Sequence, residues 1–171
     1  MAHPHHYEPV YESRHHPLHL LNVSIGRLEE EHALLQDGLM ELYKLAKLIC
    51  RKENDGLSWI GTLRDLRKKA VDFKADLNAH AWWEETELFP MVGSYFDEGL
   101  EQLMLMEQEH ELAERFILAF LEAAERAPVR HYDAKQMAAY LLQAHTILTN
   151  HFRHEEEVLT ALWEKSNDYG Y

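Results

Sequence analysis

The sequence predicts an all-α protein, an up-down-up-down four-helix bundle, on three observations. Apolar residues recur at steps of three or four along nearly the whole chain, and the alternation typical of strands is absent. Turn-forming residues such as Gly56 and Pro128 separate four periodic stretches of similar length. The sequence also repeats, because EEEHALLQDGL at 29–39 resembles EQEHELAERFI at 107–117. Four helices joined by short connections favour such a bundle.

The first two helices form the first expected hairpin. The first helix should begin near 18–22 and end near 53, where Asn54 and Gly56 are stop signals. Its inward stripe is Ile25, Leu28, His32, Leu35, Leu39, Tyr43, Ala46 and Cys50. The second helix should run from Ser58 to about Phe89, with Pro90 marking the end of regular helix or a kink. Its stripe is Leu66, Ala70, Phe73, Leu77, His80, Glu84 and Leu88.

The last two helices form the second expected hairpin. The third helix should cover about 97–126, with Pro128 just beyond its end. Its stripe is Leu103, Met106, His110, Glu114, Ile117 and Leu121. The fourth helix should begin with Asp133 as N-cap and end near Ser166. Its stripe is Leu141, Ala144, Leu148, His151, Glu155, Leu159 and Leu162.

The segment before the helices has a different composition. Six of the 13 histidines lie in its first nineteen positions, among three prolines. We therefore expect an extended arm over residues 1–17 and one helical domain over residues 18–166. A chain of 171 residues with 46% apolar residues can bury a sizeable core.

The charge of the chain limits its partners. Thirty acidic residues against 17 basic ones give a formal charge of −13, which repels phosphate backbones and anionic membranes. No apolar run approaches a membrane span, and the N-terminus has no apolar centre like that of a secretory signal. With Cys50 as the only cysteine, no intramolecular disulfide or thiolate metal site is expected. These features predict a cytoplasmic protein without nucleic-acid or membrane partners, which could form a homo-oligomer.

A second repeat carries polar residues at inward positions. LNAHAWWEETEL at 77–88 aligns without a gap with LTNHFRHEEEVL at 148–159. Residues four apart on a helix lie about 40° apart around the axis, so His80 and Glu84 share a direction, as do His151 and Glu155. Both pairs lie on apolar stripes, so we interpret them as interior groups rather than solvated ion pairs.

Six side chains should meet in one layer of the bundle, since two further histidines occupy stripes on the other helices. The six are His32, His80, Glu84, His110, His151 and Glu155. Buried carboxylates without partners cost several kcal/mol, and a metal removes that cost. Imidazole with carboxylate suits iron, manganese or zinc. Two carboxylates could each bridge two ions, and their charge of only −2 would leave room for a small anion.

The motifs resemble the hemerythrin HHE cation-binding domain family. An EH pair on the first and third helices and HxxxEE on the second and fourth carry the resemblance, which covers about residues 20–165. It implies a four-helix bundle with two iron ions, oxo- or hydroxo-bridged, and the same six residues as ligands. It also implies binding, sensing or reaction with O2, NO or peroxide, in oxidative or nitrosative stress or in iron handling. His110-xxx-Glu114 departs from the HxxxH of the oxygen carriers.

Several residues near the predicted ligands receive lesser roles. Glu114 is left open as a ligand, whereas Glu85 and Glu156 should orient ligands or face solvent. Asp76, one turn before His80, is predicted to accept a hydrogen bond from it. Packing roles are expected for Trp82, Trp83, Phe116 and Phe152.

Two alternatives stay open at this point. A ferritin-like carboxylate di-iron oxidase or ferroxidase would use the ExxH pairs Glu29/His32 and Glu107/His110 with Glu84 and Glu155, but leaves His80 and His151 unexplained. A helical interaction module without metal would use none of them. Neither the choice between enzyme and sensor or carrier nor the metal is fixed by the sequence.

Overall fold

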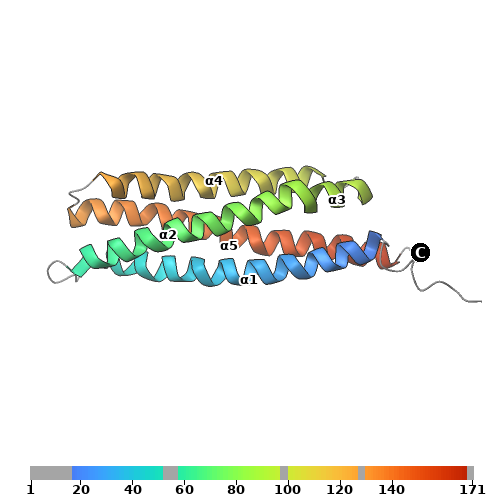
Figure 1. The fold of residues 1–171 in the computed structure, drawn as a ribbon, viewed down its shortest axis with the longest axis horizontal. Coiled ribbons are helices and arrows are strands. Elements are labelled where there is room, and N and C mark those ends of the chain that lie inside the picture. Colours follow the sequence, from blue (N-terminus) through green and yellow to red (C-terminus); the bar gives the residue numbers. More distant parts are fainter. Residues whose placement is uncertain (1–16, 52–57, 97–99, 127–129, 169–171) are drawn as a thin grey trace, which may run out of the picture.

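A computed structural model describes residues 17–51, 58–96, 100–126 and 130–168 of the chain. Four long helical rods lie side by side (Figure 1), which confirms the predicted all-α bundle. The helices are α1 (Pro17–Cys50), α2 (Ser58–Trp83), α4 (Leu100–Glu125) and α5 (His131–Asp168). Between α2 and α4, the rod of α2 continues through the π-helix η2 (Glu84–Leu88) into α3 (Phe89–Tyr95). All but Pro17 of the predicted arm lies outside the described residues.

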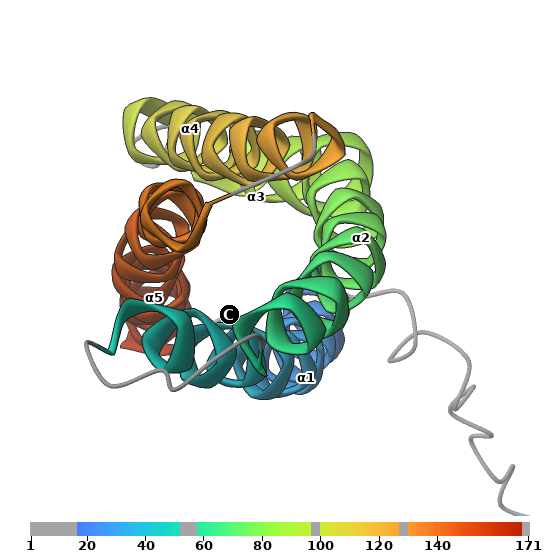
Figure 2. The same ribbon diagram turned by 90° about the vertical axis from the view of Figure 1, so that its left-hand side faces the viewer.

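The rods surround a common interior. Viewed end-on, they follow the order α1, α2, α4, α5 around a ring (Figure 2). Each packs on its two ring neighbours, so α1 contacts α2 and α5, and α4 contacts the same pair. This arrangement directs one face of every helix toward the same axis.

A π-turn interrupts the second rod near its proline. The N–H of Phe89 donates to the carbonyl of Glu84, five residues back instead of four. Pro90 has no N–H, and in a regular helix its ring would clash with the carbonyl of Thr86, so the wider turn relieves a conflict at this place. Regular helix therefore ends at Trp83, earlier than the predicted Phe89, and resumes in α3.

The inward stripes drift along the first rod. Near its C-terminal end, Leu42 and Ile49 are buried, whereas the predicted Tyr43 and Cys50 are only half-buried. A fixed spacing of three and four residues predicts a buried face that stays in one direction, whereas the face that points to the bundle axis rotates slowly along a helix. Trp82 was expected to pack against other residues, but 63% of its surface is exposed.

Two apolar clusters fill the interior. The larger surrounds Phe73, Ile117, Phe120 and Phe152 from all four rods. The smaller lies at the α3 end and contains Leu21, Leu28, Trp83, Leu88, Phe89, Val92, Leu103, Met106, Leu159 and Leu162. On each rod, the buried polar residues among the described ranges lie at or next to the point in sequence where one cluster gives way to the other. No helix among the described residues is long and apolar enough to cross a membrane.

Candidate metal centre

The six predicted ligand residues are all buried. His32 lies on α1, His80 on α2, Glu84 at the start of η2 and His110 on α4, while α5 supplies His151 and Glu155. None exposes more than 5% of its surface, and they are the only buried polar or charged residues in the described ranges. The fold therefore concentrates its buried polarity in one layer.

Four of these residues form a first group. Nε2 of His80 lies 2.6 Å from Oε1 of Glu84, and Nε2 of His32 lies 3.8 Å from that same oxygen. Oε2 of Glu155 is 3.2 Å from Nε2 of His32. One ligand atom from each of the four residues lies within 4.8 Å of the others, a spacing at which one ion could contact them all.

The remaining histidines form a second group around the same carboxylate. Nε2 of His110 lies 3.4 Å from Oε2 of Glu84, and the ligand atoms of His110, His151 and Glu84 lie within 4.8 Å of one another. Nε2 of His151 is 3.5 Å from Oε2 of Glu155. Glu84 thus directs one oxygen toward each group.

The facing atoms lack hydrogen bonds among the described residues. Their contacts are short but do not have hydrogen-bond geometry, and the buried atoms without a partner are His32 Nε2, His80 Nε2, both oxygens of Glu84, both nitrogens of His110, His151 Nε2 and both oxygens of Glu155. Buried polar groups are normally satisfied, and each exception costs about 1–3 kcal/mol or more. Buried nitrogen and oxygen atoms that converge in this way without hydrogen bonds fit a cation.

Three of the histidines are oriented from behind by a second carboxylate. The distances from Nδ1 to the carboxylate oxygen are 2.8 Å for His32 with Glu156, 2.8 Å for His80 with Glu31, and 3.0 Å for His151 with Glu109. An ionised carboxylate can only accept, so Nδ1 donates its proton and Nε2 of the neutral ring keeps its lone pair for the centre.

Residues 23–163 match the family model described as the hemerythrin HHE cation binding domain. The chain belongs to this family. The match spans all four rods and includes every one of the six layer residues. Comparison with curated proteins and with solved structures gave no significant match. Family membership and the buried His/Glu groups together indicate a cation site in this HHE domain.

The carboxylates that orient the ligands were only partly predicted. Glu156 has the predicted role, but Asp76 is exposed and Nδ1 of His80 bonds to a different carboxylate, so the prediction for Asp76 is wrong. Glu31 occupies the position instead, from the neighbouring rod. The available signal was the repeated EH pair, since the residue before an inward histidine lies about 100° around the helix, facing the next rod.

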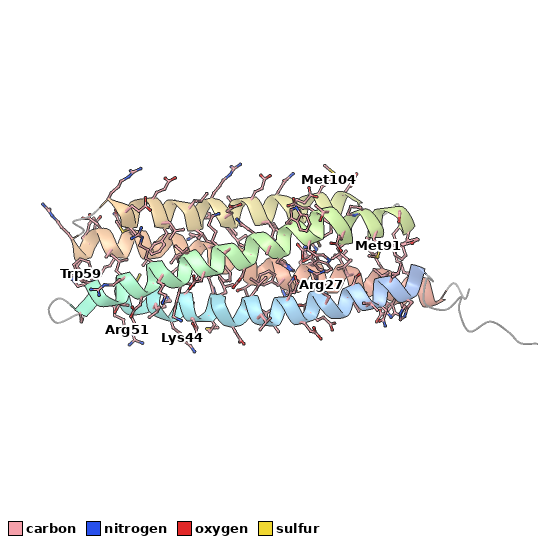
Figure 3. All side chains as sticks on the ribbon, in the orientation of Figure 1. Arg27, Lys44, Arg51, Trp59, Met91 and Met104 are labelled. Carbon is pink, nitrogen blue, oxygen red and sulfur yellow. The ribbon has the colours of Figure 1, made fainter. Side chains whose placement is uncertain are left out.

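Arg27 supports Glu31 from the outer side. Its Nε donates to Oε1 of Glu31 at 2.6 Å, and its guanidinium lies 4.1 Å from the ring centroid of Trp83. Burial raises the pKa of the Glu31 carboxyl, but the His80 and Arg27 contacts outweigh it and lower the pKa. Figure 3 labels Arg27, which lies nearer to Met91 than to Trp59 along the long axis of the bundle. A chain of contacts therefore runs from the surface through Glu31 to His80.

Burial and close charges shift the pKa values of several side chains in the layer. Burial would lower the pKa of His32, but Glu155 and Glu84 reverse this and raise it to about 9. Burial raises the pKa of Glu84 well above its usual value, and burial with the neighbouring histidines lowers that of His110 well below its own. A bound proton on His32 thus offsets part of the carboxylate charge that a metal would neutralise.

Two other candidate ligands lie outside the layer. Glu114 pairs with Lys74 Nζ at 2.8 Å and belongs to neither group of ligand atoms. Glu29, needed by the ferritin-like alternative, is exposed. The HHE pattern therefore accounts for the buried layer, and the ExxH pattern does not.

Proposed function

We propose that this HHE domain holds a non-haem dinuclear iron centre, oxo- or hydroxo-bridged, that binds, senses or reacts with O2, NO or peroxide. The observation that carries the proposal is Glu84, whose two oxygens face two different groups of buried, unpartnered ligand atoms. One ion would suit His32, His80, Glu84 and Glu155, and the other would suit Glu84, His110 and His151.

The donor set supports iron. Imidazole nitrogen with carboxylate oxygen suits iron, and manganese or zinc are further candidates. Two carboxylates supply −2 against +4 to +6 from two irons, so small anions must complete the charge balance. Groups of four and three protein ligand atoms leave coordination positions open on six-coordinate ions. Open positions with surplus positive charge suit a small diatomic or peroxide ligand.

A groove on the surface beside the layer reaches His80. It has a volume of about 500 Å³, lies between α1 and α2, and is lined in part by Arg27, Glu31 and His80. The layer itself is closed off from solvent, since its residues are almost fully buried. A small ligand therefore fits the site better than a large substrate.

Metal analysis of the purified protein tests the proposal. We expect about two irons per chain and charge-transfer absorption in the oxidised form. His80→Ala and His151→Ala should lower iron content and melting temperature together. His154→Ala is the matched control, because His154 lies on the same helix as His151 but belongs to neither ligand group. Near-zero metal in the wild-type protein after growth in iron-rich medium would refute the proposal.

Rapid mixing of the reduced protein with NO or with peroxide separates the modes of action. A sensor or carrier would bind the ligand stoichiometrically, with one absorbance change per site. An enzyme would consume many equivalents of peroxide when an electron donor is supplied. A ferroxidase would instead accumulate many irons per chain. The exposed position of Glu29 argues against the ferritin-like ligand set that this alternative needs.

A further inference from the structure

One of the four histidines differs from the others behind its ring. Three have a carboxylate on Nδ1 at 2.8–3.0 Å, but Nδ1 of His110 is buried and has no hydrogen-bond partner in the part of the chain that the structure describes. A ligand histidine normally donates its second N–H to an acceptor, which fixes the ring and raises the basicity of the coordinating nitrogen. His110 receives neither benefit.

The internal repeat identifies the residue that could have filled this role. His32 corresponds to His110, and Glu156, which binds His32, corresponds to Glu85. The side chain of Glu156 is 37% exposed and reaches Nδ1 of His32, whereas Glu85 is exposed and makes no hydrogen bond to Nδ1 of His110. The repeat therefore predicts a fourth pair that the structure does not contain.

The backbone explains the difference between these two equivalent positions. Glu156 lies on the uninterrupted helix α5, but Glu85 lies inside the π-helix η2. A π-turn changes the angle between successive side chains, so Glu84 can point inward while Glu85 is directed elsewhere. Burial and the nearby carboxylates of Glu107, Glu111 and Glu114 raise the pKa of Glu85, which therefore lies beside α4.

We infer that the two cation positions are unequal, and that the position of Glu84, His110 and His151 releases its ion first. The inference rests on the proposed dinuclear centre. The other position has four ligand atoms and two histidines that are each held by a carboxylate. The weaker position has three ligand atoms within 4.8 Å of one another, with Oε2 of Glu155 at 3.5 Å from Nε2 of His151, and only His151 is held by a carboxylate in this way. Loss of one such outer contact typically costs about 10- to 100-fold in metal affinity.

The test follows the release of iron rather than activity. Full-length protein without metal is loaded anaerobically with Fe2+ alone, and release to an excess of the chromogenic chelator ferrozine is recorded. The wild-type protein should release its iron in two phases of equal size, whose rates differ by about 10- to 100-fold. His110→Ala should remove the fast phase and leave the slow one.

Glu156→Gln and Glu85→Gln form the matched pair, because they change equivalent positions of the repeat. Glu156→Gln should accelerate the slow phase by about 10- to 100-fold, whereas Glu85→Gln should change neither phase. Both residues are at least partly exposed, so this pair is informative even if His110→Ala does not fold.

Two results would overturn the inference alone. One is release of both irons in a single phase from the wild-type protein. The other is an acceleration by Glu85→Gln as large as that by Glu156→Gln, which would mean that Glu85 supports His110 once metal is bound. If the wild-type protein takes up no Fe2+, the inference and the dinuclear centre both fail, so the two failures are distinguishable.

Discussion

The two hairpins of the bundle supply equivalent ligands from different backbones. In the first, Glu84 begins a π-turn; in the second, the equivalent Glu155 lies within continuous α-helix. Both carboxylates are fully buried, and both lie four residues after a histidine that a carboxylate orients. The two carboxylates therefore reach the same layer although the backbones that carry them differ. The surroundings differ, since both histidines of the first hairpin are oriented by a carboxylate, whereas in the second hairpin only His151 is.

The hairpins also distribute their bulk differently. Gly38 on α1 faces Phe73 on α2, because a Cβ at Gly38 would lie 3.2 Å from Phe73 Cδ2. The equivalent residues of the second hairpin are Phe116 and Ala144, so the large ring is on the other helix of the pair. Each hairpin therefore carries one large and one small side chain at these two positions, which suits close packing.

Glu84→Gln should have the largest effect, because Glu84 is shared by both groups of ligands. We expect iron content to fall from about two per chain to near zero. The metal-free variant should melt no lower than metal-free wild type, since a neutral amide removes a buried carboxylate that has no partner. Metal analysis and thermal denaturation measure both effects.

Glu114→Gln is the control for this change, since Glu114 pairs with Lys74 outside the layer. It should retain full iron content. Full iron content in Glu84→Gln would contradict the shared role of this carboxylate.

Glu31→Gln and Glu109→Gln should have intermediate and similar effects, one in each hairpin. Each weakens the acceptor of one ligand histidine, so we expect about a 10- to 100-fold loss of affinity for one iron. Titration of metal-free protein with Fe2+ measures the loss. Asp76→Asn should bind like the wild type, because Asp76 is exposed and Nδ1 of His80 bonds to Glu31 instead. An Asp76→Asn variant as weak as Glu31→Gln would reverse this assignment.

Gly38→Ala should have the smallest effect and should sharpen the packing comparison. Alanine favours a helix interior by up to about 1 kcal/mol over glycine, but here its Cβ would press on Phe73. Gly26→Ala is the control in the same helix, since nothing lies within 4 Å of its Cβ. We expect Gly26→Ala to raise the free energy of unfolding by more than Gly38→Ala does, as measured by urea denaturation. Equal gains would show that Phe73 yields without cost.

Periodicity was sufficient to predict the four rods and the inward direction of the six polar residues. His80 and Glu84 lie four apart, so their common direction follows from helix geometry alone. The two groups that these residues form in the structure agree with the predicted layer, while ligation itself stays a prediction.

Contacts between rods could not be predicted in this way. Asp76 was chosen for His80 because it is one turn away on the same helix, whereas Glu31 reaches His80 from α1. The π-turn was missed for a related reason. Pro90 signals a disturbance of the helix, but whether the chain stops, kinks or widens depends on the packing of Leu88 and Phe89 in the core.

The polar layer falls between a larger and a smaller apolar cluster, and this affects how the rod unfolds. Apolar contacts stabilise each of the two clusters. The buried polar atoms between the clusters have no hydrogen bonds among the described residues, so without metal this layer should be the least stable part of the bundle. Ions bound there would join the two ends into one cooperative unit. Metal loss would then be followed by opening of the α3 end, where proteases and hydrogen exchange would report it first.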